Sequence, residues 1–271
     1  MSTRLLIDSD ILVYRAGFAT DKTKYLLESP GGARSPIDDF ATAKRLAATD
    51  EGSVIWSRKA TEPEDKALLL IDVMIGEIHA RYSEQRPIVV CFLTGMGNYR
   101  NSIATRLPYK GNRDQPKPAH FKAIRNYLLT KWGAVLSAGE EADDLIGIEA
   151  TTDKDCIICS IDKDLKQLPG RHFNFVTKEE STVSVKDASL NFFMQCLTGD
   201  ATDNIPGVAG IGPVKAKNIL DGAKSVSDCW KRILDVYQEQ YKEFGEAYAI
   251  ECARLVHLRR TVGQIWEPPT L

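Results

Sequence analysis

The sequence predicts an α/β protein with a parallel sheet in its first part and an all-α region in its last. Short apolar runs at residues 4–8, 87–93 and 156–160 alternate with helical patterns, which is typical of parallel strands joined by helices. Past residue 187 only helical patterns occur, at residues 187–198, 213–222, 226–241 and 245–258. With 271 residues, 43% of them apolar, the chain is long enough to build a proper core.

Between these strands lie an amphipathic helix and a less regular segment. Residues 63–82 place a line of apolar side chains on one face at helical spacing, which predicts a helix packed in the core. The members of this line are Leu68, Ile71, Ile75, Ile78 and Tyr82. Residues 134–139 suit a further strand. Residues 20–60 contain a loop-like SPGGARSP and a strand-like GSVIWSRK, and we interpret them as an insertion to which the sequence assigns no role.

Charge is distributed unevenly along the chain. The formal net charge of −2 does not indicate a nucleic-acid partner. Residues 100–131, however, hold eight basic residues and one acid, whereas residues 139–165 hold nine acids and two bases. This arrangement is expected of an enzyme that grips polyphosphate with one segment and holds cations with the other. Two solvated helix faces would give the same counts, so charge alone leaves both interpretations open.

Cysteine usage and hydropathy favour a cytoplasmic protein with no membrane span. The six cysteines lack the dense spacing of a disulfide framework, and the first residues lack a signal-peptide core. Cys156 and Cys159 form a CxxC, but they lie in an apolar strand-like run without a second Cys or His pair at zinc spacing. We interpret them as buried strand residues. No apolar run approaches the roughly 18 residues that a membrane helix needs.

Acidic residues gather at the ends of predicted elements. Four groups stand there: Asp8 with Asp10, Glu141 with Asp143 and Asp144, Asp162 with Asp164, and Asp200 with Asp203. In open parallel sheets ligands bind beyond the carboxyl ends of the strands. Carboxylates converging there repel one another unless divalent cations neutralise them, and oxygen ligands without a nearby histidine suit Mg²⁺ or Mn²⁺. Any one pair can be a helix cap or a surface acid, but four such groups favour a two-metal site for phosphodiester hydrolysis.

The first acidic group also suggests a different enzyme. IDSD after an apolar strand resembles the nucleophile motif of haloacid-dehalogenase-like phosphatases, in which the first Asp is phosphorylated and the second moves a proton. This hypothesis uses Asp8 and Asp10, with Asp143 and Asp144 as further acids. It gives no role to the glycine-rich segment that begins at residue 207.

Residues 207–220, GVAGIGPVKAKNIL, indicate a hairpin that holds a phosphate backbone. Gly207, Gly210 and Gly212 bracket a turn, Pro213 suits the first position of a helix, and two lysines follow. The segment is neither a Walker loop, because GKS or GKT is missing, nor a calcium loop. GxxGIG before a basic helix is typical of helix-hairpin-helix modules, which hold the backbone of duplex DNA without reading bases.

Five motifs in order make the chain similar to the flap endonuclease and 5′-3′ exonuclease superfamily. They are LLIDSDILVYRA, RLPYKGNRDQPKP, EEADDLIG, SIDKDL and GDATDNIPGVAGIGPVKAKNI, and they cover nearly the whole chain. The chain resembles the 5′-nuclease domain of bacterial DNA polymerase I and, more closely in size and motif wording, the stand-alone exonucleases of tailed phages. The resemblance implies a PIN-like α/β 5′-nuclease catalytic domain at residues 1–186, with a helical arch at about residues 94–122. A helical helix-hairpin-helix (H3TH) DNA-binding region is implied at residues 187–271.

The resemblance also implies roles for individual residues. The implied metal-binding carboxylates are Asp8, Glu141, Asp143, Asp144, Asp162, Asp164, Asp200 and Asp203, and the implied catalytic residues are Lys110, Arg113 and Asp143. The implied DNA contacts are Arg15, Arg100, Arg106, Lys117, Gly207, Gly210, Gly212, Lys215 and Lys217. The implied cofactors are two Mg²⁺ or Mn²⁺ ions, and in relatives the hairpin also holds a potassium ion. The implied partner is duplex DNA with a 5′ end, nick or flap, or an RNA:DNA hybrid, bound by a monomer.

One position departs from the family pattern. The family usually has an Asp after the second strand, where this sequence has Thr94 and Gly95. We expect a divalent-metal-dependent 5′-3′ exonuclease and flap endonuclease, acting in phage DNA replication and primer removal in the host cytoplasm. The alternative is a junction-binding protein that keeps the fold without cleavage. The departure at Thr94 is the only support for that alternative, and eight retained acids argue against it.

Overall fold

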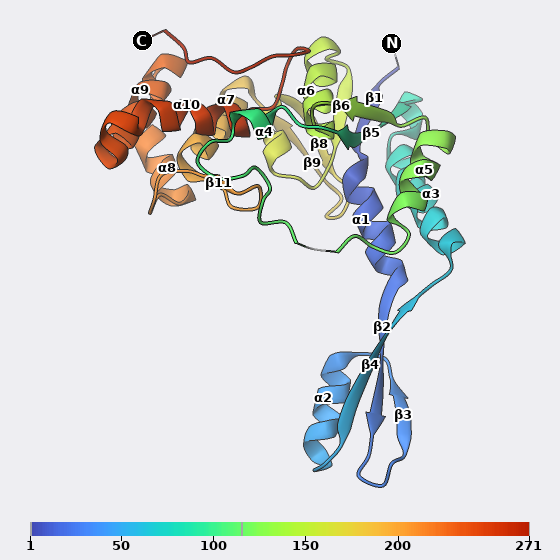
Figure 1. Ribbon diagram of the computed structural model, residues 1–271. Helices are drawn as coiled ribbons and strands as arrows, with labels where there is room; N and C mark the ends of the chain where they lie inside the picture. The colour runs from blue at the N-terminus through green and yellow to red at the C-terminus, as the bar shows by residue number, and fades with distance from the viewer. Residues whose placement is uncertain (1, 115, 271) are drawn as a thin grey trace. The chain divides into compact units, whose positions relative to one another are not determined.

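The computed structural model describes residues 2–114 and 116–270, which form two compact units (Figure 1). The first unit is made of residues 2–11, 78–114 and 129–270. The second is made of residues 12–77 and 116–128. Within the part of the chain that the structure describes, no helix is both long enough and apolar enough to cross a membrane.

A six-stranded sheet with the order β6-β5-β1-β7-β8-β9 forms the centre of the first unit. Its strands are β1 (Arg4–Asp8), β5 (Ile88–Met96), β6 (Val135–Ala138), β7 (Cys156–Cys159), β8 (Gly170–Asn174) and β9 (Glu179–Val183). Neighbouring strands are parallel except for the antiparallel pair β8 and β9. Leu6 of β1 lies between Val90 of β5 and Ile158 of β7, and its side chain is fully buried. The predicted parallel sheet is therefore confirmed.

The sequence predicts β1, β5, β6 and β7 but not the hairpin of β8 and β9. β1 and β7 are apolar runs because nearly all their side chains are buried in the sheet, and β5 is buried at its centre. β6, at the other edge of the sheet, is buried only at Ser137. β9, EESTV, lies at the edge of the sheet and exposes all its residues except Val183, so it lacks an apolar signal. Cys156 and Cys159 are buried in β7, as predicted, and both are free thiols.

Helices make up most of the rest of the first unit. They are α4 (Arg100–Ile103), α6 (Ala142–Thr152), α7 (Val185–Thr198), α8 (Pro213–Leu220), α9 (Val226–Tyr241) and α10 (Gly245–Val256), with 3-10 turns at Ser83–Gln85, Asp164–Gln167 and Lys242–Phe244. A two-stranded ribbon of β10 (Gly199–Asp200) and β11 (Ile205–Pro206) lies between α7 and α8 in the sequence. The four helical patterns that the sequence shows past residue 187 correspond to α7 to α10.

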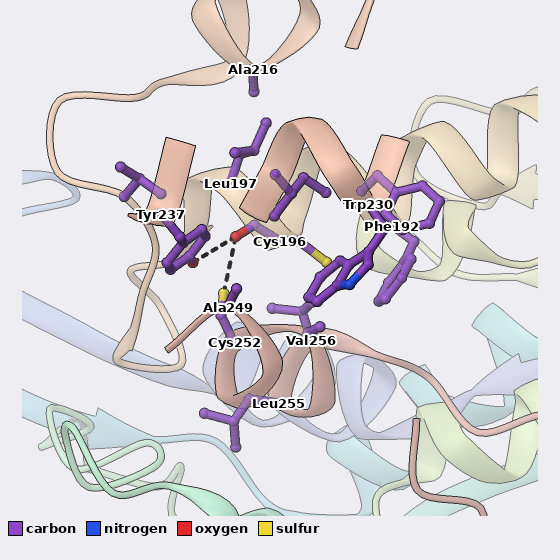
Figure 2. Close-up of a cluster of buried hydrophobic side chains, with 14 of the residues drawn as sticks. Phe192, Cys196, Leu197, Ala216, Trp230, Tyr237, Ala249, Cys252, Leu255 and Val256 are labelled. Carbon is purple, nitrogen blue, oxygen red and sulfur yellow. Dashed lines mark hydrogen bonds between the residues drawn. The ribbon is translucent and has the colours of Figure 1, made fainter. Parts of the chain in front are cut away.

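An aromatic core holds these C-terminal helices together (Figure 2). Trp230 and Tyr237 of α9 are almost completely buried. The Tyr237 hydroxyl and the Cys252 thiol of α10 both donate hydrogen bonds to the backbone carbonyl of Cys196 in α7, at 2.8 and 3.3 Å. Three helices therefore meet at one carbonyl, and the helical region has a core of its own.

The second unit contains a small sheet in the segment that the sequence leaves irregular. Its strands β2 (Asp21–Glu28), β3 (Arg34–Ile37) and β4 (Val54–Thr61) are antiparallel in the order β3-β2-β4, with helix α2 (Phe40–Thr49) between β3 and β4 in the chain. Three longer helices begin or end in this unit: α1 (Ser9–Thr20), α3 (Glu64–Arg81) and α5 (Phe121–Lys131). In α3 the predicted apolar face is buried at Ile71 and Ile75.

Candidate active site

Two neighbouring strands of the main sheet end in acids that one serine connects. Asp8 is the last residue of β1 and is 4% exposed, and Asp162 follows β7, the strand paired with β1. The Ser160 hydroxyl donates to Asp8 Oδ2 at 2.9 Å and accepts from the backbone N–H of Asp162 at 3.0 Å. The carboxyl ends of parallel strands thus bring these acids together, as the sequence predicts.

Most of the other predicted acids line one small cavity. The cavity has a volume of about 30 Å³, and the acids that line it are Glu141, Asp143, Asp164, Asp200 and Asp203. They come from the start of α6, from the segment after β7 and from the β10–β11 ribbon. The charges of Asp8 and Asp162 act directly on Asp143, so the two groups of acids form one electrostatic cluster.

Four acids of this cluster, one buried and three half-buried, lie near other carboxylates, and their pKa values rise as a result. Burial, together with neighbouring acids, raises the pKa of Asp8 to about 7. Burial and then the charges of Asp8 and Asp162 raise the pKa of Asp143 well above its usual value. The pKa of Asp164 is raised to about 7, mainly by burial and next by Asp162, and burial also raises the pKa of Asp162. Ionising these side chains therefore costs free energy that a nearby cation would offset.

Two other acids already have protein cations beside them. Lys110 Nζ forms a short ion pair with Glu141 and lies 3.5 Å from Asp203 Oδ2, while Arg113 forms a short ion pair with Asp203. The Tyr109 hydroxyl lies 3.0 Å from Glu141 Oε2 and 2.9 Å from Asp203 Oδ2. Lys110 itself has a φ of 56°, a conformation that residues other than glycine rarely adopt. Such strain persists only where the surroundings enforce it, and it is concentrated at functional sites.

Asp144 and Arg100 require a correction to the predicted roles. Both side chains are buried, and Arg100 holds Asp144 through two hydrogen bonds of 2.6 and 2.9 Å. The Asp144 carboxylate also accepts the backbone N–H groups of Glu141 and Arg259, each at 3.1 Å. Burial alone would raise the pKa of Asp144, but the hydrogen bonds and charge of Arg100 outweigh it and the pKa is lowered. Four N–H donors saturate the carboxylate, so Asp144 has no lone pair facing a metal, and Arg100 is not exposed to DNA.

The departure at Thr94 has a structural role. The backbone N–H of Thr94 donates to Asp10 Oδ2 at 2.8 Å, and its hydroxyl accepts the backbone N–H of Ala142 at 3.0 Å. Ala142 is the first residue of α6, whose first N–H groups have no partner within the helix. Asp10 in the first turn of α1 and Thr94 of β5 therefore connect these two elements to the start of α6, which carries Asp143.

Three residues that the sequence analysis did not single out contact the cluster: Ser160, Tyr109 and Gln195. The side chain of Gln195, a residue of α7, donates a hydrogen bond of 2.5 Å to Asp164 Oδ1. Tyr109 is the first residue of the YKGNR motif, so the sequence alone could have identified it as a candidate site residue. Gln195 had no such signal, because its contact with Asp164 spans 31 residues.

The predicted hairpin lies between α7 and α8. Gly210 has a φ of 75°, and a Cβ on Gly207 would meet the backbone of Thr198 at 2.3 Å, so both positions need glycine. Gly212 is the N-cap of α8, which begins at Pro213 as predicted. Lys215 and Lys217 are exposed, and Lys215 Nζ donates to the Gly210 carbonyl at 2.9 Å.

The other predicted DNA contacts are in different environments. Arg106 lies against the rings of Tyr241 and Tyr248 and donates to the Pro206 carbonyl at 2.9 Å, so it is fixed beside the hairpin. Arg15 and Lys117 belong to the second unit, and both are exposed there.

The described part of the chain contains no ready-made metal site. Within residues 2–114 and 116–270, no group of three or more His, Cys, Asp or Glu side chains is arranged so that it could hold a metal ion. The donor chemistry nonetheless suits hard divalent cations, because the cluster offers carboxylate oxygens and no histidine. Asp8, Asp143, Asp162 and Asp164 are the candidates, since none of them forms an ion pair with Lys or Arg among the described residues.

Comparison with known sequences supports the predicted resemblance. No family model matches the chain. The chain is 30% identical over 161 residues to a flap endonuclease Xni of Shewanella sp. (strain W3-18-1). The matched region covers 54% of this chain and 61% of the relative. The chain is also 28% identical over 200 residues to a 5′-3′ exonuclease of Mycoplasmopsis pulmonis. This matched region covers 65% of this chain and 66% of the relative. The chain thus spans slightly less than two thirds of these relatives.

Solved structures show the same fold. The zinc-bound 5′-exonuclease of T5 matches with a TM-score of 0.57 and 19% identity over 94% of this chain and 89% of that protein. The bacteriophage T5 D15 flap endonuclease, in a pseudo-enzyme–product complex with DNA and metal ions, matches with a TM-score of 0.52 and 20% identity over 70% of this chain and 80% of that protein. The resemblance to the flap endonuclease and 5′-3′ exonuclease superfamily is confirmed, and the PIN-like fold class with it.

Proposed function

We propose that this chain is a divalent-metal-dependent 5′-3′ exonuclease and structure-specific flap endonuclease of that superfamily. One observation carries the proposal: Asp8, which is buried, and Asp143, Asp162 and Asp164, which are half-buried, have raised pKa values and lie in one cluster. Among the described residues, none of the four forms an ion pair with Lys or Arg. A phosphatase with Asp8 as nucleophile explains this cluster less well, since Asp10 is hydrogen-bonded to Thr94 and Asp144 is saturated by Arg100.

The cluster fits two Mg²⁺ or Mn²⁺ ions by its chemistry. The ligands would be Asp8, Asp143, Asp162 and Asp164, joined by Asp200, which is linked to Asp164 by a side-chain hydrogen bond. When bound, such a pair of ions activates a water molecule and stabilises the leaving oxygen of a phosphodiester. Glu141 and Asp203 would join these ligands once their ion pairs with Lys110 and Arg113 open, which leaves Asp144 as the one predicted ligand outside the set.

Lys110 and Arg113 then contact the phosphate of the strand to be cut. Both are at least partly exposed, and both already lie at the acid cluster through Glu141 and Asp203. A phosphate offers these cations the same charge and oxygen donors as the carboxylates they now hold. Exchange of carboxylate for phosphate would therefore keep their charges neutralised as the substrate enters.

Residues 187–271 would hold the duplex, residues 1–186 would cut it, and residues 94–122 would form the arch. Gly207, Gly210 and the N-terminus of α8 present backbone groups, and Lys215 and Lys217 add exposed charge, which suits a phosphate backbone. The backbone carbonyls of the hairpin at residues 207–212 would also hold a potassium ion, as they do in the relatives that the sequence resembles. Binding through the backbone has little sequence preference and weakens steeply with salt. The flap endonuclease of T5 is described with DNA and metal ions, which supports this arrangement.

The proposal is tested by cleavage of 5′-labelled flap and blunt duplexes, and of an RNA:DNA hybrid, with Mg²⁺, Mn²⁺ or EDTA. We expect short 5′ products with either metal and none with EDTA. Asp143→Asn should slow cleavage by about 100-fold or more while duplex binding is kept. Asp235→Asn, at an exposed position of α9, is the matched control and should cleave normally.

Cleavage that persists in EDTA, or that is equal in both variants, contradicts the proposal. Tight binding of the flap without product under any metal would instead identify a junction-binding protein. Cleavage of the RNA strand would support a role in primer removal during phage DNA replication.

A further inference from the structure

The small sheet of the second unit has one covered face and one open face. In the antiparallel register Tyr25 pairs with Ser57 and Leu26 with Trp56, and paired side chains lie on the same face of a sheet. Helix α2 lies beside this sheet (Figure 1). It covers the face of Tyr25, because the centre of the Tyr25 ring lies 5.5 Å from that of Phe40 in α2. The opposite face carries alternate residues of the three strands: Lys22, Lys24, Leu26 and Glu28; Arg34 and Pro36; and Val54, Trp56, Arg58 and Ala60. We name this set the basic sheet face.

The basic sheet face exposes large apolar side chains. Trp56 is 50% exposed and Val54 49%, and Leu26 beside them is 37% exposed. Trp56 is not loosely held, because its indole N–H donates to Glu28 at 2.6 Å. Arg34 also donates to Glu28, at 2.9 Å, and lies 5.4 Å from the centre of the Trp56 ring. The one acid of this face therefore fixes an exposed aromatic ring and a neighbouring guanidinium.

The charge of the face is strongly positive. It carries four basic residues against Glu28, and Lys22 is partly neutralised by Glu62 from the start of the next segment, at 2.7 Å. Lys24 and Arg58 lie directly opposite each other on neighbouring strands, and neither has an ion-pair partner among the described residues. Like charges in this position destabilise a sheet. An anionic ligand bound at this face would relieve that repulsion.

We propose that the basic sheet face binds single-stranded nucleic acid, as a second site apart from the acid cluster and the hairpin. A fixed, exposed indole offers a stacking surface for an unpaired base, and the nearby cations Lys24 and Arg58 suit the phosphates on either side of it. Bases within a duplex are stacked on each other and do not reach such a ring. The combination of aromatic and cationic groups therefore selects a single strand over a duplex.

The test measures binding of a 5′-fluorescein oligodeoxythymidine to the whole chain by anisotropy, in EDTA so that no cleavage occurs. Trp56→Ala should weaken binding about 5- to 100-fold, and Trp56→Phe should restore most of it. Lys24→Gln with Arg58→Gln should lower the slope of log affinity against log salt by about 1.4. The matched control is Lys44→Gln with Arg45→Gln, an equal charge change at exposed positions of α2, and it should behave as the wild type.

Circular dichroism melts establish that each variant is folded, and Trp56→Phe provides a test if the alanine variant is not. Affinities within two-fold of the wild type for both the Trp56 and the Lys24/Arg58 variants overturn the proposal. So does a loss confined to the Lys24/Arg58 variant, which would point to an acidic protein partner without base stacking. Affinity for a blunt duplex should be unchanged throughout, and an equal loss there would also contradict the proposal. None of these outcomes depends on whether the chain cleaves DNA.

Discussion

Asp143 and Asp144 are adjacent in sequence and opposite in environment, which allows a sharp test. Asp144 is fully buried and held by Arg100 in a two-point ion pair, whereas Asp143 lies among other acids with its pKa raised by burial. Asp144→Asn removes one partner of a buried ion pair and leaves the guanidinium of Arg100 without a counter-charge. Asp143→Asn removes a charge that the folded chain holds at a cost.

The expected magnitudes follow from these environments. Removing one partner of a buried ion pair costs about 3–5 kcal/mol. For a chain of this size each kcal/mol shifts the melting temperature by about 2–4 °C, so Asp144→Asn should lower it by roughly 6–20 °C. Asp143→Asn should leave the melting temperature in EDTA unchanged or higher, because a desolvated charge is lost. Added Mg²⁺ should raise the melting temperature of the wild type and of Asp144→Asn more than that of Asp143→Asn.

Calorimetric melts with EDTA and with Mg²⁺, together with flap cleavage below the melting transition, provide the assay. Asp144→Asn should be unstable but still cleave, and Asp143→Asn should be stable but inactive. Arg100→Met in the Asp144→Asn background tests the pairing, because the double variant should lose less than the sum of the single changes. If Asp144→Asn has a normal melting temperature and no activity, Asp144 is a metal ligand and the structural assignment is refuted.

Three further changes test other parts of the structure. Burial and then the charge of Arg260 lower the pKa of His257 to about 3, below its value of 6.5 in an unfolded chain. The stability that neutral His257 contributes is therefore present above pH 6.5 and is lost as the pH falls towards 3. Denaturant melts should show the wild type losing about 2 kcal/mol more than His257→Gln between pH 7 and pH 5, and equal losses would exclude His257 as the cause. Gly199→Ala should unfold at much lower denaturant than Gly210→Ala, because both have positive φ but only at Gly199 would a Cβ meet backbone, at 2.2 Å; similar midpoints would argue against the tight β10–β11 ribbon. Thr94→Val should cost about 1 kcal/mol by removing the hydroxyl that accepts the first N–H of α6, and Thr94→Ser should restore it; a serine variant as unstable as valine would show that the hydroxyl is not the cause.

The sequence alone determined the central strands, the C-terminal helices and the positions of the acids. Buried parallel strands are apolar on both faces, and α9 repeats apolar residues at helical spacing. Both patterns are local, so they can be recognised in the sequence without knowledge of the fold. The edge strand β9 and the strands β2 and β3 were not predicted, whereas the strand-like run GSVIWSRK corresponds to β4. These strands are largely exposed and polar, because an edge or a two-layer element buries too little surface to produce an apolar run.

Only the tertiary structure decided what each acid does. Asp143 and Asp144 are indistinguishable in the motif EEADDLIG, and both were predicted as metal ligands. The fold places Arg100 against one of them, 44 residues away in sequence, and leaves the other beside Asp8 and Asp162. Thr94 and Trp56 acquire their roles in the same way, from partners at separations of 48 and 28 residues. The protonation and coordination of a carboxylate depend on which groups surround it in space, and no local pattern in the sequence records those neighbours.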